Sequence, residues 1–317
     1  MEKRFKGCLF GLAIGDALGA PVEFLSWQQI RKKYGDSGIK DFDSWGGFAA
    51  GTYTDDTQMS LATAAGCVDA WIRGREKGIW HPSSVVYLKY LEWLKTQSDP
   101  KQTRGPGHTC LSALRSGKMG SVDEPINNSK GCGGVMRTAP AGLAFPPGQA
   151  FEQGVAFAAI THGHPSGYLP AGVLAEITSN LVRGKALGEA IGLSLIPLRK
   201  YRGYAETMAC LEKAMDLANS NLPVTEAIEK IGEGWVGEEA LAIAVYCSLK
   251  YSHNWARGTL AAVNHSGDSD STGSITGAIL GTLLGLEAIP TFWVIRVENT
   301  GYIERLATEM WELFAKK

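Results

Sequence analysis

The chain has 317 residues, with 31 Lys or Arg against 32 Asp or Glu, so its formal net charge is -1. A near-neutral chain without a broad basic field does not fit general nucleic-acid binding. The six cysteines lie far apart and form no CxxC pair, which favours reduced thiols in a cytoplasmic protein over disulfides or a zinc site. The most apolar run, residues 275–295, is interrupted by Glu287 and Pro290, and it predicts a buried helix rather than a membrane span. The N-terminal stretch lacks a clean apolar core and a cleavage site, so no signal peptide is expected.

Helical periodicity dominates the chain, and no alternating strand pattern stands out. No low-complexity linker and no repeat divides the sequence, so we expect one domain over residues 1–317, with no heptad seam and hence a monomer. The predicted helices cover residues 3–19, 55–74, 83–96, 107–117, 150–162, 167–183, 186–200, 204–219, 223–232, 237–251, 255–263, 271–287 and 300–315.

Two of these predicted helices carry glycine at every fourth position. The set consists of Gly7, Gly11, Gly15 and Gly19 in the first helix, and Gly273, Gly277, Gly281 and Gly285 in the late one. Each glycine costs a helix roughly 1 kcal/mol relative to alanine. Four on one face therefore indicate close approach of another backbone, which can bring residues distant in sequence together.

Two acidic residues accompany the first helix. Asp16 lies within an otherwise apolar stretch, which predicts a buried and hydrogen-bonded carboxyl group. Glu23 follows the expected helix end near Gly19 and Pro21. From the pattern alone, Glu23 is either a solvated loop residue or part of a site.

The segment of residues 53–59 places two more carboxylates at a helix start. Thr54 has the chemistry of an N-cap, and Asp55 and Asp56 fall in the first helical turn, where free backbone N–H groups and the helix dipole favour negative charge. A well-capped helix is one interpretation of this segment, and a ligand site is the other.

A second cluster of the same type precedes the late apolar helix. Asp268 and Asp270 alternate with hydroxyl residues, including Ser271. The two clusters together offer four carboxylates and several hydroxyl oxygens, which suit hard cations such as Mg²⁺, Mn²⁺ or Ca²⁺. Four like charges in one place would repel one another unless cations neutralised them.

Five runs in this order resemble the ADP-ribosylglycohydrolase family, which includes dinitrogenase-reductase-activating glycohydrolases and ADP-ribosylarginine hydrolases. The runs are GDALGAPVEF (15–24), YTDDTQM (53–59), GCGGVMRTAPAGL (131–143), THGHPSGY (161–168) and HSGDSDSTGSITGAILG (265–281). The resemblance implies an all-α fold: a single compact orthogonal helical domain around a dinuclear metal cleft.

The resemblance also implies roles for individual residues. It implies two Mg²⁺ ions, with Mn²⁺ as a substitute, and it implies that Glu23 lies beside the metals and the scissile ribose. Ser271 stands where family members often have threonine, and the hydroxyl oxygen is retained. The implied metal ligands are Thr54, Asp55, Asp56, Asp268, Asp270 and Ser271.

Two further matched segments point to the substrate. Small residues at Gly131, Gly133 and Gly134 suit a loop whose backbone N–H groups approach a diphosphate, although glycine turns before helices are common. Similarity places His162 near the ADP-ribose, while the alternative for a histidine here is a helix cap. Family members often carry asparagine where this chain has Cys132. Nitrogenase-type members tend to place an aspartate in the segment that matches residues 104–111, and none occurs here, which weakens assignment to that system.

The expected reaction is hydrolysis of the N-glycosidic bond in ADP-ribosylarginine of a modified protein, with ADP-ribose as a product. Glu23 would act as general base, and Asp56 and Asp270 would bridge or flank the ions at the reacting ribose. The alternatives are another linkage (serine, O-acetyl-ADP-ribose or nucleic acid), a non-catalytic crystallin-like or ADP-ribose-binding protein, and an immunity protein. Residues 41–48, an aromatic and glycine-rich loop, are either a lid over the substrate or an ordinary packed loop.

Overall fold

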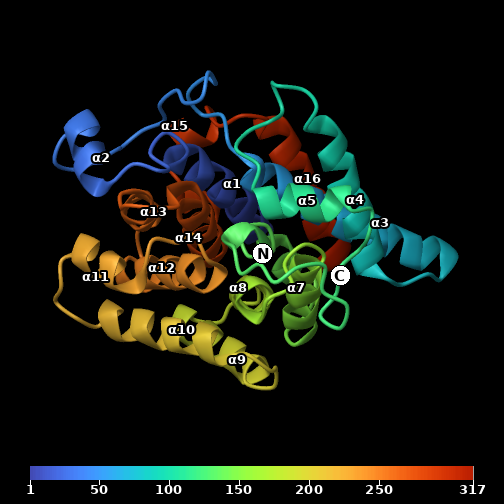
Figure 1. The fold of residues 1–317 in the computed structure, drawn as a ribbon. Helices are drawn as coiled ribbons and strands as arrows, with labels where there is room; N and C mark the ends of the chain where they lie inside the picture. Colours follow the sequence, from blue (N-terminus) through green and yellow to red (C-terminus); the bar gives the residue numbers. More distant parts are fainter. Residues whose placement is uncertain (317) are drawn as a thin grey trace.

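The computed structural model describes residues 1–316 as a bundle of helices joined by short loops (Figure 1). Residues 1–316 contain no β-strand, and only the isolated bridges Trp45–Phe48 and Gly131–Val236 pair extended backbone. The all-α class is confirmed. The helices are α1 (Glu2–Gly19), α2 (Trp27–Tyr34), α3 (Asp55–Lys77), α4 (Pro82–Thr96), α5 (His108–Arg115), η1 (Cys132–Gly134), α6 (Ala139–Ala144), α7 (Gln149–Ala159), α8 (Pro165–Val182), α9 (Leu187–Leu198), α10 (Ala205–Ala218), α11 (Val224–Ile231), α12 (Gly237–Lys250), α13 (Trp255–Val263), α14 (Ser269–Leu284), η2 (Leu286–Ala288), α15 (Thr291–Val294) and α16 (Thr300–Phe314).

All thirteen predicted helices are present, with ends that shift by up to three residues. The periodicity missed α6 and α15, which offer too few turns for a pattern to develop, and it missed α2, which is as long as α5 but buries only Ile30. For α2 a local signal existed: Ser26 and Gln29 form a reciprocal capping box.

The glycine faces of α1 and α14 pack against each other. A Cβ atom on Gly11 would collide with the carbonyl of Gly277, and one on Gly15 with the carbonyl of Gly273. Gly7 meets Gly281 and Gly19 meets Ser269 in the same way, so the two helices run antiparallel. The close approach expected from the glycine spacing is therefore confirmed.

The α1–α14 pair lies near the middle of the molecule, and α3, α13 and α16 also pack against α1 (Figure 1). The helices α3, α4 and α5 lie on one side of the pair, and α9, α10 and α11 lie on the other. No helix within residues 1–316 is both long and apolar enough to cross a membrane. The run at 275–295 divides into the end of α14 and the short elements η2 and α15.

Antiparallel pairing has a direct consequence for the acidic residues. It brings the C-terminal end of α1, with Glu23 just beyond it, next to the N-terminal end of α14, which carries Asp268 and Asp270. The first turn of α3 joins this junction through hydrogen bonds to Asp16 of α1. Three elements far apart in sequence therefore end at one place.

Candidate functional site

The N-terminus of α14 presents two carboxylates. Asp268 is the N-cap, and its Oδ1 accepts from the backbone N–H of Ser271 at 3.3 Å. The backbone N–H of Asp268 in turn donates to the Glu233 carbonyl at 2.8 Å, which anchors the turn. The helix begins at Ser269, two residues before the predicted start, so Asp270 lies in its first turn rather than on extended backbone.

The N-terminus of α3 presents the second pair. Thr54 is the N-cap, as predicted, and its Oγ1 accepts from the backbone N–H of Asp56 at 3.2 Å. Asp16 stabilises this turn through three hydrogen bonds. Its carboxylate accepts from the backbone N–H groups of Thr54 (2.9 Å) and Thr57 (3.0 Å) and from the Thr57 hydroxyl (2.5 Å). The buried carboxyl group expected at position 16 is thus a support for the Thr54–Thr57 turn.

These elements bring the carboxylates together. Oxygen atoms of Glu23, Asp268 and Asp270 lie within 4.8 Å of one another. The Ser271 hydroxyl donates to Oδ2 of Asp56 at 2.8 Å and so joins the α14 cluster to the α3 cluster. All of them line one pocket of about 320 Å³, whose walls are Glu23, Phe24, Asp55, Asp56, Gly105, Pro106, Gly107, His108, Cys132, Gly133, Met136, Trp235, Asp268, Asp270 and Ser271.

Burial and mutual repulsion disfavour the charged forms of these acids. Burial, followed by the charges of Asp270 and Asp268, raises the pKa of Glu23 to about 11. Burial and the charge of Asp270 raise the pKa of Asp16 to about 7. The pKa values of Asp55, Asp56 and Asp268 also lie well above the ordinary aspartate value, with burial as the largest cause. Such a cluster needs positive charge before all its members can ionise together.

The donor atoms fit a hard divalent cation. Carboxylate and hydroxyl oxygens are the ligands that Mg²⁺ and Mn²⁺ prefer. Oδ1 of Asp270 is buried and has no hydrogen-bond partner within residues 1–316. An acceptor left unpaired in this way costs free energy unless a cation or water satisfies it. The residues can therefore hold a metal ion at the floor of the pocket.

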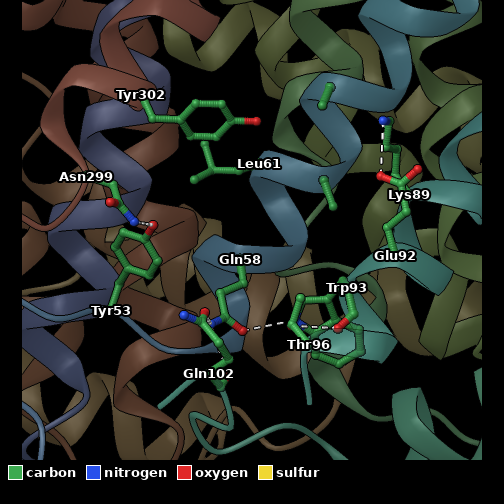
Figure 2. A pocket seen from close by; sticks show the side chains of 12 residues that line it. Tyr53, Gln58, Leu61, Lys89, Glu92, Trp93, Thr96, Gln102, Asn299 and Tyr302 are labelled. Carbon is green, nitrogen blue, oxygen red and sulfur yellow. Dashed lines mark hydrogen bonds and ion pairs between the residues drawn. The ribbon is translucent and has the colours of Figure 1, made fainter. Parts of the chain in front are cut away.

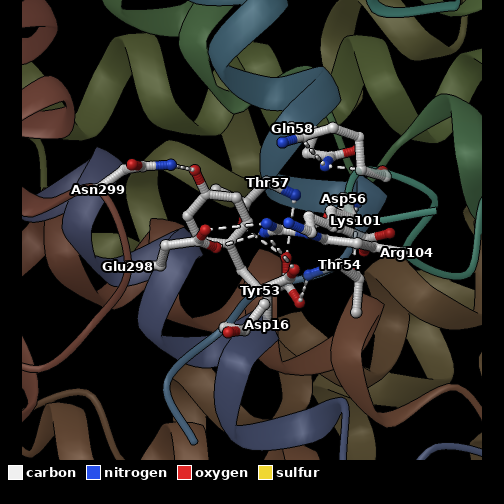
Figure 3. Close-up of polar contacts among 12 residues, drawn as sticks. Asp16, Tyr53, Thr54, Asp56, Thr57, Gln58, Lys101, Arg104, Glu298 and Asn299 are labelled. Atoms are coloured by element: carbon white, nitrogen blue, oxygen red, sulfur yellow. Dashed lines mark hydrogen bonds and ion pairs between the residues drawn. The ribbon is translucent and has the colours of Figure 1, made fainter. Parts of the chain in front are cut away.

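An arginine supports the α3 cluster from outside the pocket (Figure 3). The carbonyl of Arg104 accepts from the backbone N–H of Asp55 at 3.1 Å, and its guanidinium donates to the Tyr53 carbonyl at 3.3 Å. Both terminal nitrogens of the guanidinium donate to the Glu298 carboxylate, the second at 2.9 Å. The backbone N–H of Glu298 donates to the Gly51 carbonyl at 3.0 Å. Arg104 and Glu298 thus hold the residues on both sides of Thr54.

The glycine loop lies against His162. A Cβ atom on Gly133 would come within 3.1 Å of the His162 ring, and one on Gly134 would collide with the Gly167 carbonyl. Close packing against the ring and against α8 therefore accounts for these two glycines. Gly133 lines the pocket, while Gly131 and Gly134 are not among its lining residues.

The protonation of His162 follows from its neighbours. Nη2 of Arg137 donates to Oγ1 of Thr161 at 2.6 Å, so the threonine hydroxyl is free to donate to Nδ1 of His162 at 2.8 Å. Burial and then the charge of Arg137 lower the pKa of His162 to about 3, so the ring is neutral. Its proton accordingly sits on Nε2, which faces the glycine loop. The helix cap nearby comes from His164, whose Nδ1 accepts from the backbone N–H of Ser166 at 3.1 Å.

Two aromatic rings form the rim of the pocket. Phe24 and Trp235 stack with ring centroids 5.1 Å apart and planes inclined by 19°. Phe24 directly follows Glu23, has a positive φ of 65° and exposes 74% of its surface. Residues held in such unfavourable backbone conformations cluster at functional sites. The stack borders the carboxylate of Glu23 with an apolar surface.

A second pocket lies on another face of α3 (Figure 2). Here the polar groups satisfy one another: Nε1 of Trp93 donates to Oε1 of Gln58 at 2.9 Å, and Nδ2 of Asn299 donates to the Tyr53 hydroxyl at 2.8 Å. Glu92 in its wall pairs with Lys89 at 3.1 Å. Since its charges and amides are paired, we place the candidate site in the acidic pocket instead.

The structure separates the predicted site residues into two groups. Those that line the acidic pocket are Glu23, Asp55, Asp56, Gly133, Asp268, Asp270 and Ser271. Thr54 and His162 lie directly behind its walls, at 1% exposure each. No residue of the 41–48 loop lines the pocket. Phe48 instead packs against Arg104, whose Cζ atom lies 5.4 Å from the centroid of the Phe48 ring.

Several lining residues were not predicted from the sequence. Pro106, His108 and Met136 carry no local signal of a site, because only the folded chain brings them to the pocket. Trp235 had a weak signal, because it follows Gly232 and Gly234, which mark a loop.

Comparison with known proteins gives a consistent result. The whole chain, residues 1–317, matches the protein family described as ADP-ribosylglycohydrolase. It is 26% identical to the ADP-ribosyl-[dinitrogen reductase] glycohydrolase of Rhodospirillum rubrum, over 94% of this chain and 91% of that protein. It is 25% identical to the ADP-ribosylarginine hydrolase Tri1 of Pseudomonas putida, over 98% and 78%. It is 24% identical to the human ADP-ribosylhydrolase ARH3, over 99% and 94%.

One solved structure shares the fold over nearly its full length. An ADP-ribosylglycohydrolase-related protein complex aligns with a TM-score of 0.76 and 24% identity, over 98% of both chains.

Proposed function

Because the chain belongs to the ADP-ribosylglycohydrolase family, we propose that it is a metal-dependent hydrolase that releases ADP-ribose from arginine side chains of modified proteins. The observation that carries the proposal is the convergence of Glu23, Asp268 and Asp270 within 4.8 Å, in a pocket that Asp55 and Asp56 also line. A set of five acids, four buried and Glu23 half-buried, costs stability, and a cation-dependent reaction gives it a purpose.

Two Mg²⁺ ions, or Mn²⁺ in their place, are the proposed cofactors. When bound, they would supply positive charge to grip sugar hydroxyls and to activate water. The proposed ligands are Thr54, Asp55, Asp56, Asp268, Asp270 and Ser271. The support for this set is its all-oxygen chemistry, the unpaired Oδ1 of Asp270 and the Ser271–Asp56 hydrogen bond that joins the two groups.

Glu23 is the proposed general base. Its carboxylate borders the pocket beside Asp268 and Asp270, where a water molecule and the anomeric carbon would meet. It must be ionised to accept a proton. Burial and then the neighbouring aspartates raise its pKa, and positive charge held by Asp268 and Asp270 would lower it again into the working range. Asp56 and Asp270 are proposed to fix the reacting ribose through the same centre.

The substrate side of the pocket is proposed to take the rest of ADP-ribose. The backbone of Gly131, Gly133 and Gly134 and the Nε2 proton of His162 are the proposed contacts to the anionic diphosphate or the adenosine. Gly133 lines the pocket and the other three stand behind it, so substrate would reach them through a movement of this loop. The neutral state of His162 suits a hydrogen-bond donor that carries no charge of its own.

Arginine is proposed as the linkage because one relative over 98% of this chain is named an ADP-ribosylarginine hydrolase. The test is release of ADP-ribose from a mono-ADP-ribosylarginine protein with Mg²⁺ and then with EDTA, beside proteins modified on serine and beside O-acetyl-ADP-ribose. We expect metal-dependent release from the arginine conjugate. Release from another conjugate alone would contradict the linkage and keep the hydrolase.

Variants assign that activity to the acidic pocket. Asp268→Ala is expected to abolish release together with metal binding, and Glu23→Gln to abolish release while metal binding persists. Glu92→Gln, in the wall of the second pocket, is the matched control and should retain full activity. Unchanged turnover in Glu23→Gln with bound metal would remove Glu23 from the mechanism.

A further inference from the structure

A thiol stands among the proposed metal ligands. Cys132 begins η1, and its thiol donates to Oδ2 of Asp268 at 2.7 Å, while its Sγ lies 3.8 Å from Oγ of Ser271. The residue lines the same pocket as both of these oxygen donors. One sulfur atom therefore contacts two residues of the proposed ligand set.

A second observation at the same place points to a cation. Asp270 is 4% exposed, and its Oδ1 lacks a hydrogen-bond partner within residues 1–316. Carboxylate oxygens of Asp270, Asp268 and Glu23 lie within 4.8 Å of one another. An unsatisfied acceptor and three converging acids thus adjoin the thiol.

The spacing suits shared coordination. Zinc binds sulfur at about 2.3 Å and carboxylate oxygen at about 2.0–2.2 Å, so two such ligands on one ion lie roughly 3.1–3.7 Å apart, from octahedral to tetrahedral angles. The observed separations of 2.7 and 3.8 Å lie on either side of that range. A shift of Sγ by a few tenths of an ångström would bring it onto an ion held by Asp268.

We propose that Cys132 is a sulfur ligand for a soft divalent cation, Zn²⁺ or Cd²⁺, on the Asp268 side of the metal centre. The metal–sulfur bond forms as the thiol proton leaves to solvent, and no other reactant is needed. Thiolate ligands select soft cations over Mg²⁺. The protein would therefore bind Zn²⁺ and Cd²⁺ in competition with Mg²⁺ and be inhibited by them. This inference rests on the proposed location of the metal centre.

The other cysteines provide a matched control. Cys8, Cys67, Cys110 and Cys247 are buried, whereas Cys132 and Cys210 are half-buried. Cys210 lies on α10, outside the lining of the acidic pocket. It has comparable access to a dissolved cation but no part in the site.

The test is titration of the intact, metal-stripped protein with Cd²⁺, followed by the ultraviolet sulfur-to-cadmium charge-transfer band. We expect the band in the wild type and in Cys210→Ser, and its loss in Cys132→Ser, with Cys132→Ala as the substitute if the serine variant does not fold. Zn²⁺ should also displace Mg²⁺ from Cys132→Ser at a concentration about tenfold or more higher than from the wild type. An undiminished band in a folded Cys132 variant, or a band lost only in Cys210→Ser, overturns the proposal.

The outcome is separable from the test of function. Release of ADP-ribose with Mg²⁺ but no band with Cd²⁺ overturns the sulfur ligand and leaves the hydrolase. The band without any release supports the sulfur ligand and contradicts the proposed reaction instead.

Discussion

The contact between α1 and α14 is sensitive to a single methyl group. In Gly277→Ala the added Cβ would collide with the Gly11 carbonyl, and it would lie 2.7 Å from the carbonyl carbon. The obstacle is helix backbone, so one whole helix must move. The same atom would come within 3.4 Å of Trp255, whose Nε1 donates to the Gly277 carbonyl at 3.1 Å. Neither neighbour can move aside alone.

The magnitude follows from two opposing effects. Overpacking a filled interior costs typically about 1–3 kcal/mol, and a backbone clash belongs at the upper end. Replacing glycine by alanine inside a helix gains about 1 kcal/mol. We therefore expect Gly277→Ala to lower the free energy of unfolding by about 2 kcal/mol. Because α1 and α14 also position Glu23, Asp268 and Asp270, the same variant should bind Mg²⁺ more weakly.

The matched control lies on α9. Gly192 is an exposed helical glycine with nothing within 4 Å of its added Cβ, so Gly192→Ala should raise the free energy of unfolding by about 1 kcal/mol. Chemical denaturation followed by far-ultraviolet circular dichroism compares the two variants directly. If Gly277→Ala proves as stable as Gly192→Ala, the helices do not approach as closely as described, and the reasoning fails.

Three further predictions concern the site and its supports. Arg104→Met leaves the half-buried Glu298 carboxylate unpaired, so we expect the free energy of unfolding to fall by about 1–3 kcal/mol. The affinity for Mg²⁺, measured by calorimetry, should fall as well. An unchanged affinity would mean that Arg104 does not position the ligands. Asp270→Asn should raise the thermal midpoint of unfolding in EDTA, because it removes one repelling charge. In Mg²⁺ the same change should lower the thermal midpoint, because it removes a ligand. A shift of the same sign in both buffers would contradict a metal role for Asp270. The pKa of His162 is about 3 in the folded chain and about 6.5 in the unfolded chain, so protonation favours unfolding. Above pH 6.5 the neutral ring costs the folded chain nothing. As the pH falls from 6.5 toward 3, the free energy of unfolding drops by about 1.4 kcal/mol per pH unit. His162→Gln should flatten that slope in denaturation series at pH 4.5 and 7, the exposed His253→Gln should not, and equal slopes in all three proteins would refute the assignment.

Helices and their ends were readable from the sequence where the signal is local. Thr54 is the N-cap that the sequence predicted, because a short oxygen side chain reaches the free N–H group two residues on, and this chemistry needs no knowledge of the fold. The start of α14 was predicted two residues late, since several residues that can cap a helix stand side by side before it and the true cap is Asp268. The glycine spacing of α1 and α14 likewise predicted that another helix packs closely against each of them, since glycine otherwise only destabilises a helix.

Contacts between distant segments were not readable in this way. Nothing near Arg104 in the sequence indicates that Glu298 will pair with it, because the link depends on how the loops before α5 and α16 cross. The sequence marked Cys132 only as a position where family members often have asparagine. Its contact with Asp268 depends on the fold and was not predicted. Sequence patterns describe one element at a time, and the walls of this pocket come from at least five.

The Arg104–Glu298 pair also bears on how the protein is made. The two residues are 194 positions apart, and at about 5–20 residues per second a ribosome needs roughly 10 to 40 seconds to add Glu298 after it has added Arg104. Until then the nascent turn at Thr54–Asp56 lacks its clamp, and Asp268 and Asp270 have been synthesised only shortly before. Under the proposed function, a cation could bind the completed site only late in translation or after release.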